Sequence, residues 1–130
     1  MTSSGKNNLP VSIIKNFKYA LIGLGHILKS ERNARIHLAV AIVVSIAAIA
    51  LDLPATELVA IFFAILTVFI AEIFNTVVEK MLDLVHPEQS PKVALIKDMA
   101  AGAVLVTAVG AAVMGFVIFG PYVLGAIWNR

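Results

Sequence analysis

Hydrophobic positions along the chain gather into three long runs that are separated by short polar segments. Each run approaches the roughly 20 residues that a helix needs to cross about 30 Å of hydrocarbon. The first run is the shortest and reaches this length only with the apolar residues at its flanks. The predicted transmembrane helices comprise residues 36–53, 57–79 and 98–119.

A fourth helical pattern precedes these runs, within residues 11–30. Apolar side chains such as Ile13, Phe17 and Leu24 recur there at helical intervals, while lysines occupy other positions around the helix. This pattern predicts an amphipathic helix that lies at the membrane surface, with its basic residues toward anionic head groups. The alternative is a cytoplasmic helix packed on the bundle.

The remaining segments complete a single membrane domain. Residues 1–10 are a polar tail, residues 80–97 are the cytoplasmic end of the second span and its loop, and residues 120–130 are a C-terminal tail. Gly120 and Pro121 are predicted to break the third helix, because proline removes a backbone donor. The expected fold class is an all-α membrane protein with one surface helix and three transmembrane helices.

Composition supports a membrane protein and excludes several other classes. Hydrophobic residues make up 60% of the 130 residues and charged residues only 14%, whereas soluble domains carry about 25% charged residues. The chain has no cysteine, which excludes a disulfide scaffold and cysteine metal sites. Its net charge of +2 without a basic stripe argues against a nucleic-acid partner.

The basic residues predict the orientation of the chain in the membrane. Nine of the ten lysines and arginines precede the first span or lie between the second and third spans, and the turn at residues 52–57 has none. Cytoplasmic loops carry the excess of lysine and arginine. We therefore predict a multi-pass protein of the cell membrane with its N-terminus in the cytoplasm and its C-terminus outside.

Polar residues form a stripe on the second span. At about 100° per residue, Glu72, Asn75, Glu79 and Asp83 fall within an arc of roughly 80°. Glu72 lies well inside the apolar run, where a carboxylate costs a few kcal/mol or more and marks a functional site by default. The alternative is a structural hydrogen bond between helices.

Further charges are expected at the same cytoplasmic surface. Lys97 and Asp98 open the third span, and Glu31 precedes the first. Carboxylate and amide oxygens suit Mg²⁺ that is carried on substrate phosphates, and a lysine suits phosphate oxygens. With Glu72 as a candidate general base, these residues indicate phosphoryl transfer in outline.

Several other patterns are discounted as ligand sites. Gly23 and Gly25 lack the third glycine and the preceding strand of a nucleotide-binding loop. His26, His37 and His86 are not spaced as metal ligands and are interpreted as interfacial histidines. The many alanines and glycines of the third span are interpreted as a tightly packed helix face.

Two other functional classes are considered on the same residues. A small proton-coupled transporter would use Glu72 as its proton carrier. The gathering of Glu31, Glu79 and Lys97 at one membrane surface argues against it, because a transporter needs access from both sides. A structural membrane subunit would leave the polar stripe without an explanation.

The stripe reads Glu72-x-x-Asn75-Thr76-x-x-Glu79-x-x-x-Asp83. This motif resembles the signature of the small prokaryotic integral-membrane lipid kinases, the diacylglycerol kinases and their undecaprenol kinase relatives. The resemblance extends over nearly the whole chain, and its supporting segments are residues 17–20, 31–37 and 97–105.

The resemblance implies an ATP- and Mg²⁺-dependent transfer of the γ-phosphate to a lipid hydroxyl, in a homotrimer whose active sites are shared between neighbouring subunits. In such an enzyme Glu72 would be the general base, and Glu31 and Glu79 would hold the metal ions. The implied nucleotide site, in which Asn75 and Asp83 support or extend the metal shell, comprises Tyr19, Glu31, Asn75, Glu79, Asp83, Glu88, Gln89, Ser90, Lys97 and Asp98.

One departure and two similarities bear on the lipid acceptor. Ser12 stands where the diacylglycerol kinase branch carries an arginine near phosphate, so that this contact is absent or is supplied by Lys15. Residues 31–37 and 100–105 are more similar to the undecaprenol kinase branch. The expected acceptor is therefore a lipid alcohol, undecaprenol, with diacylglycerol as the alternative.

Overall fold

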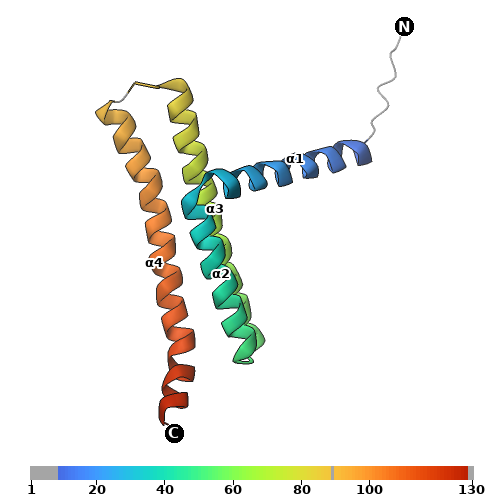
Figure 1. The fold of residues 1–130 in the computed structure, drawn as a ribbon, viewed down its shortest axis with the longest axis vertical. Helices are drawn as coiled ribbons and strands as arrows, with labels where there is room; N and C mark the ends of the chain where they lie inside the picture. The colour runs from blue at the N-terminus through green and yellow to red at the C-terminus, as the bar shows by residue number, and fades with distance from the viewer. Residues whose placement is uncertain (1–8, 89, 129–130) are drawn as a thin grey trace.

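The computed structural model describes residues 9–88 and 90–128, and its elements are four α-helices. Three of them, α2, α3 and α4, run side by side in alternating directions, and α1 projects sideways from the start of α2 (Figure 1). These three are also the helices long and apolar enough to cross a membrane, so the all-α class and the three candidate spans are confirmed. The helices are α1 (Leu9–Ser30), α2 (Arg32–Ala50), α3 (Ala55–Val85) and α4 (Pro91–Trp128).

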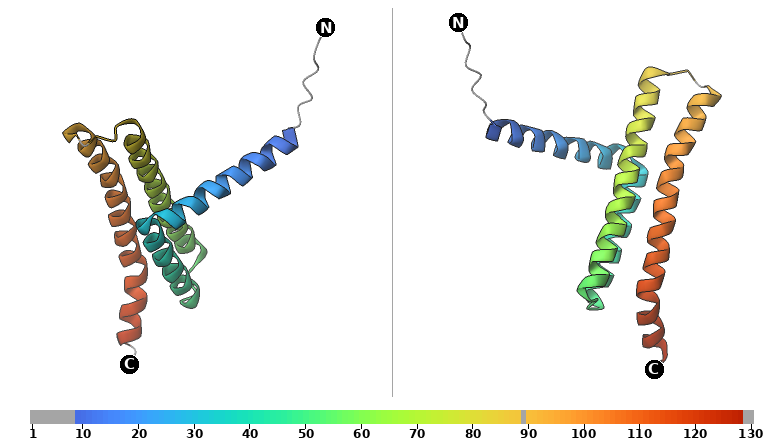
Figure 2. Two further views of the ribbon diagram at one scale, coloured as in Figure 1. Left: turned by 45° about the horizontal axis from the view of Figure 1, so that its top comes forward. Right: turned by 180° about the vertical axis from the view of Figure 1, so that it is seen from behind.

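A corner of one residue, Glu31, joins α1 to α2. The Glu31 N–H donates to the carbonyl oxygen of Ile27 at 2.8 Å, and Arg35 Nη1 donates to the carbonyl oxygen of Lys29 at 2.9 Å. These bonds satisfy carbonyl groups that the end of α1 leaves without helical partners. Beyond the corner α1 points away from the bundle in both further views (Figure 2), and apolar side chains such as Ile14 are exposed.

A tight turn joins α2 to α3 at the opposite end. Asp52 adopts a left-handed conformation with φ of 51°, the Asp52 N–H donates to Ile49, and the Leu53 N–H donates to Ala48. This pair of bonds is the Schellman arrangement, in which the residue after the C-cap is left-handed. Leu53 then packs with Ala48 and Ile61 in the buried core. The turn therefore fixes how α2 and α3 pack.

The predicted helix break at Gly120 and Pro121 is wrong, because α4 continues to Trp128 with Pro121 inside it. An interior proline removes one backbone hydrogen bond, but helices in membranes tolerate this loss when neighbouring groups stabilise the segment. Here Tyr122 donates to Glu57 Oε2 at 3.0 Å and packs against the Ala48 core. The contact with the start of α3 holds the end of α4 in place.

Two of the helices are longer than a membrane is thick. At 1.5 Å per residue, the 31 residues of α3 extend about 46 Å and the 38 residues of α4 about 57 Å. Only residues 86–90 separate them, so most of the predicted loop at residues 80–97 is helical. The α3–α4 hairpin therefore rises beyond the level of α1 (Figure 1).

Three glycines of α4 are not in tight contact with another helix within the described residues. A Cβ atom added at Gly102, Gly110 or Gly115 would meet nothing within 4 Å. The prediction of a tightly packed face is therefore wrong within the chain at these positions. The space beside Gly115 belongs to a pocket between α2, α3 and α4.

Candidate active site

Three polar side chains are buried in α3 near the middle of the bundle. Glu72 is 2% exposed, Thr76 3% and Asn75 7%. Burial of an ionisable carboxyl costs several kcal/mol unless partners compensate. The residues therefore occupy a position that a purely structural helix would give to apolar side chains.

Two oxygen atoms of this group have no hydrogen-bond partner in the part of the chain that the structure describes. Asn75 Nδ2 donates to Glu79 Oε1 at 2.9 Å, which orients the amide and leaves its oxygen free. Glu72 Oε2 and Asn75 Oδ1 are both buried without a partner among the described residues. Unsatisfied buried polar atoms are rare in folded proteins and need an explanation such as a bound ligand or ion.

Glu72 and Asn75 line a pocket of about 290 Å³ to which three helices contribute residues. Glu72 and Asn75 come from α3, and Asn33 and His37 come from the first turns of α2. The opposite wall is apolar and belongs to α4, where Ala101, Val104, Leu105 and Ala108 line it. A carboxylate, two amides and an imidazole therefore line one pocket beside an apolar wall.

Ion pairs lie above this pocket, at what we call the charged end of the bundle, defined by Glu31, Glu79, Lys80, Asp83 and Lys97. Lys80 Nζ lies 2.8 Å from Glu31 Oε1, and Ser30 Oγ donates to the same oxygen at 2.9 Å. The Lys80 ammonium, followed by the Ser30 hydroxyl, holds the pKa of Glu31 below its ordinary value. The lowered pKa of Glu31 favours its ionised form.

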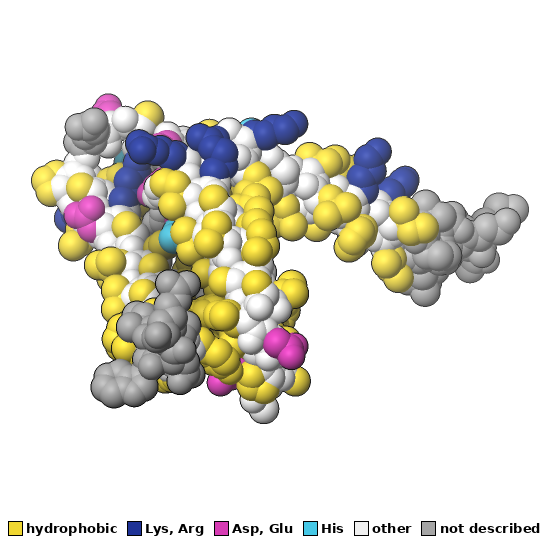
Figure 3. Space-filling view, turned by 60° about the horizontal axis from the view of Figure 1, so that its bottom comes forward, with side chains coloured by type: hydrophobic (Ala, Val, Ile, Leu, Met, Phe, Trp, Pro, Cys, Tyr) yellow, Lys and Arg dark blue, Asp and Glu magenta, His cyan; other side chains and the backbone are white. Residues whose placement is uncertain are grey.

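A second pair joins the two arms of the α3–α4 hairpin. Lys97 of α4 donates to Asp83 of α3, and the two side chains are 33% and 65% exposed. Lys97 lies nearly two turns inside α4, because this helix begins at Pro91 rather than next to Lys97 as its sequence position suggested. Asp98 follows on the exposed surface of α4. Lysine and arginine side chains gather at this end and along α1, while hydrophobic side chains cover the flanks (Figure 3).

Other predicted nucleotide ligands are not brought to this site within one chain. Tyr19 and Lys15 lie exposed on α1, which extends away from the bundle (Figure 1). Glu88 is exposed in the loop between α3 and α4. Ser90 caps α4, since its hydroxyl oxygen accepts from the Val93 N–H at 3.3 Å.

Gln89, another predicted nucleotide ligand, and the side chain of Ser12 lie outside the described residues.

Sequence reasoning missed two residues of the pocket, Asn33 and His37. The interpretation of His37 as an interfacial histidine is incomplete, because His37 lines the Glu72 pocket. The signal is their spacing: Asn33, His37, Ala41 and Val44 recur at helical intervals on α2, and each lines a pocket that faces α3. In the sequence, the charged residues of α3 are easier to recognise as a site than two polar residues, Asn33 and His37, at the start of an otherwise apolar helix face.

The carboxylates of the charged end suit a metal that arrives with its substrate. Among the described residues, no group of three or more His, Asp or Glu is close enough to hold an ion by itself. Mg²⁺ keeps several waters and binds through one or two carboxylates together with substrate phosphates. Glu79, which accepts a hydrogen bond from Asn75, and Glu31, which is paired with Lys80, are two carboxylates at this end.

Comparison with known proteins identifies the protein family to which the chain belongs. The profile of the family described as prokaryotic diacylglycerol kinase matches residues 18–119. The chain belongs to this family. The match includes the Glu72 pocket, both ion pairs and all but the last residues of α4.

Two curated relatives carry different names within this family. The undecaprenol kinase of Bacillus subtilis is 35% identical over 121 residues, which cover 93% of this chain and 98% of the relative. The diacylglycerol kinase of Synechocystis sp. is 34% identical over 105 residues, which cover 80% of this chain and 60% of the relative. No solved structure gives a significant match to the chain.

Proposed function

We propose that this chain is a membrane lipid kinase that transfers the γ-phosphate of ATP to the hydroxyl of a lipid alcohol. The observation that carries the proposal is the pair of buried oxygens, Glu72 Oε2 and Asn75 Oδ1, which have no partner among the described residues and belong to two side chains that line a pocket near the charged end. Such a pocket offers a proton acceptor to a hydroxyl group. Family membership favours this chemistry over a proton-coupled transporter or a structural subunit.

Undecaprenol is the proposed acceptor. The relative that carries this name matches nearly end to end, whereas the chain covers 60% of the relative named diacylglycerol kinase. Diacylglycerol is the second candidate, because the family profile and that second relative both bear its name.

In the proposed reaction Glu72 accepts the proton of the lipid hydroxyl. The hydroxyl oxygen forms a bond to the γ-phosphorus of ATP, and the bond from that phosphorus to the β–γ bridging oxygen breaks. The products are the lipid phosphate and ADP. Asn75 keeps Glu79 in place through its amide N–H and presents its oxygen to the pocket. Positioning and electrostatic stabilisation are the principal contributions that a protein makes to phosphoryl transfer.

The charged end is the proposed nucleotide site. Glu31 and Glu79 would hold Mg²⁺ on the ATP phosphates, where the metal neutralises phosphate charge. Lys97 would exchange Asp83 for phosphate oxygens, with Asp98 beside it. The loop residues Glu88, Gln89 and Ser90 are proposed to border the nucleotide.

The proposed placement puts α1 on the cytoplasmic surface of the cell membrane. Its exposed apolar residues would enter the interface, and Lys15 and Lys18 would meet head groups or phosphate. The 19 residues of α2 extend about 28 Å, close to the hydrocarbon thickness, from a start next to α1. This placement puts the N-terminus inside and the C-terminus outside.

A homotrimer with shared sites is the proposed assembly. Tyr19 and Lys15 lie on a helix that extends away from the Glu72 pocket of their own chain. They can line a nucleotide site only if α1 reaches a neighbouring subunit. This is the arrangement that the family resemblance implies.

The proposal is tested with purified protein in detergent, ATP labelled in the γ-phosphate, and undecaprenol or diacylglycerol at matched concentrations. We expect labelled lipid phosphate with Mg²⁺, its loss on chelation with EDTA, and a faster rate with undecaprenol. A faster rate with diacylglycerol would reassign the acceptor. No labelled lipid from either acceptor would refute the proposed activity.

A further inference from the structure

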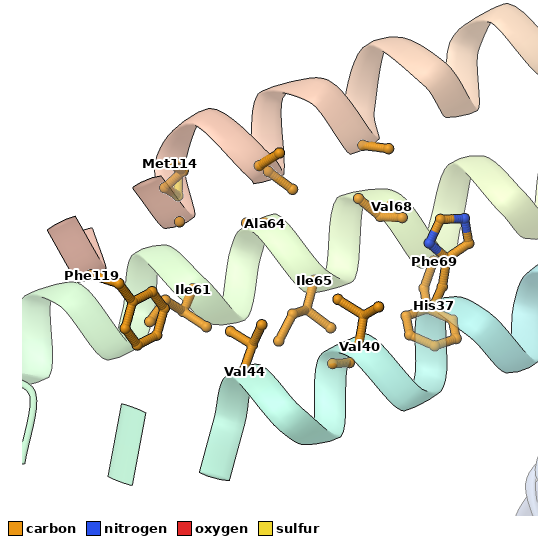
Figure 4. A pocket seen from close by; sticks show the side chains of 15 residues that line it. His37, Val40, Val44, Ile61, Ala64, Ile65, Val68, Phe69, Met114 and Phe119 are labelled. Atoms are coloured by element: carbon orange, nitrogen blue, oxygen red, sulfur yellow. The ribbon is translucent and has the colours of Figure 1, made fainter. Parts of the chain in front are cut away.

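Lysine and arginine side chains do not line the pockets of the bundle. The pocket of about 250 Å³ between α2, α3 and α4 is lined by His37 and otherwise by alanine, glycine and larger apolar residues such as Val40, Ile65 and Met114 (Figure 4). The described residues that line the Glu72 pocket include no lysine or arginine either. Within one chain, positive charge for the phosphates of a nucleotide therefore has to come from the charged end of the bundle, where such side chains gather (Figure 3).

Two lysines of the charged end are paired with carboxylates. Lys97 donates to Asp83, and Lys80 Nζ lies 2.8 Å from Glu31 Oε1. The two pairs differ in the carboxylate that is held, because Glu31 is one of the residues proposed to bind Mg²⁺. Lys80 therefore occupies a group that the reaction needs for another cation.

The Lys80 contact falls on an oxygen that could serve as a metal ligand. Ser30 Oγ donates to the same atom, Glu31 Oε1, at 2.9 Å. Mg²⁺ binds carboxylate oxygens, so the ammonium group and the metal ion compete for Glu31. Mg²⁺ that binds at this oxygen has to displace Lys80.

A displaced Lys80 side chain has phosphate oxygens as its next partners. This side chain is 49% exposed, and its flexible four-carbon stem lets the ammonium group move while the backbone of α3 stays in place. Mg²⁺ is bound together with substrate phosphates, so phosphate oxygens arrive next to the position that the ammonium group leaves. Lysine binds such oxygens as a compact positive charge.

We propose that Lys80 is a phosphate-binding residue of the nucleotide site, which neutralises Glu31 before the nucleotide binds and moves to the ATP phosphates when Mg²⁺ replaces it on Glu31. The inference rests on the proposed kinase function and deepens it. Lys80 and Lys97 then act alike, since each leaves a carboxylate of its own chain for phosphate. No proton or covalent bond is transferred in this exchange.

The first test measures the binding of a non-hydrolysable ATP analogue, AMP-PNP with Mg²⁺, to the purified protein in detergent by titration calorimetry. We expect Lys80→Met to raise the Kd about tenfold, because a charge-assisted contact with phosphate is lost. Lys80→Arg, which keeps the charge, should bind within about twofold of wild type. Lys29→Met is the matched control, because Lys29 is an exposed lysine near the same corner without an ion pair among the described residues, and its Kd should not change.

The second test measures the binding of Mn²⁺ alone, without nucleotide, by electron paramagnetic resonance. Mn²⁺ accepts the same oxygen ligands as Mg²⁺. We expect Lys80→Met to bind Mn²⁺ about two to five times more tightly than wild type, because an exposed ion pair that competes for Glu31 is gone. Glu31→Gln should bind Mn²⁺ more weakly, and unchanged binding by Glu31→Gln would overturn the exchange.

Opposite shifts of the two affinities distinguish the exchange from a structural ion pair. A Lys80 that only stabilises the corner between α1 and α2 would leave both affinities unchanged or weaken both in Lys80→Met, and either result refutes the inference. If Lys80→Met does not fold, Lys80→Gln takes its place, and the same opposite shifts are expected.

The outcomes also separate this inference from the proposed function. A wild-type protein that phosphorylates no lipid refutes the function. An active wild type whose Lys80→Met variant binds AMP-PNP with Mg²⁺ as tightly as wild type refutes the role of Lys80 alone.

Discussion

Glu72 is buried in an apolar helix, and the neighbouring Asn75 is already hydrogen-bonded to another residue. Asn75 commits its amide N–H to Glu79 and leaves its oxygen in the same pocket as Glu72. Neither residue completes its hydrogen bonds within the described chain. Their burial therefore costs stability that the described residues do not recover through hydrogen bonds.

Asn75 is expected to support activity by holding the Glu79 carboxylate in position. Asn75→Leu removes the 2.9 Å bond to Glu79 Oε1, and a hydrogen bond to a charged group is worth about 1.5–3 kcal/mol. We expect kcat/KM to fall about tenfold or more in the phosphate-transfer assay. Thr67→Val, at an exposed position of the same helix, is the matched control. Equal activity of the two variants would show that Asn75 does not organise the site.

The pairing of Glu31 with Lys80 gives a pH dependence of defined sign. Because the pKa of Glu31 is lowered in the folded state, chiefly by its hydrogen bond with Lys80, the pair stabilises the fold above the unfolded-state pKa. That contribution disappears as the pH falls through the folded-state pKa. Thermal unfolding in detergent should therefore show a small wild-type advantage over Glu31→Gln at pH 7 that vanishes in acid. An advantage that grows in acid would contradict the pairing.

At the scale of elements, the sequence predicted the features that periodicity determines and missed those that depend on tertiary contacts. Apolar run lengths indicated the three spans, and the 80° arc of α3 indicated the stripe that begins buried at Glu72 and ends exposed at Asp83. The local effect of Pro121 was outweighed by the contact of Tyr122 with Glu57. The position of His37 beside Glu72 depends on where α2 meets α3, and the helical spacing of His37 on α2 does not by itself determine that contact.

The turn between α2 and α3 offers a direct test of its geometry. A non-glycine residue in the left-handed region costs about 1–2 kcal/mol, and Asp52 is in that region with φ of 51°. Asp52→Gly should therefore raise the unfolding temperature in detergent, and Asp52→Val should lower it. The same response to both substitutions would argue against the Schellman turn.

For the whole molecule, the main question is how a site is completed when one chain supplies only part of it. The described chain brings together the Glu72 pocket and the ion pairs of the charged end, and leaves Tyr19 on a projecting helix. Sequence similarity identified the family, but the geometry of a single chain cannot place α1 against a neighbour. The proposed trimer accounts for that separation.

Shared sites predict complementation between two inactive variants. Tyr19→Ala and Glu72→Gln subunits should each be weakly active alone. Oligomers reconstituted from both, after mixing in denaturing detergent, should recover activity because some sites combine an intact Tyr19 with an intact Glu72. Mixed oligomers would be isolated through two different tags. If these oligomers remained inactive, Tyr19 and Glu72 would belong to the site of one chain.

The most direct measurement of the central claim is the rate of phosphate transfer from labelled ATP to undecaprenol by Glu72→Gln. Loss of a general base typically lowers the rate about 10²- to 10⁴-fold, and we predict a loss of this size with an unchanged oligomer mass. Glu57→Gln, at the opposite end of the same helix, should remain active. A Glu72→Gln protein that phosphorylates undecaprenol at the wild-type rate would contradict the role of Glu72 as the general base.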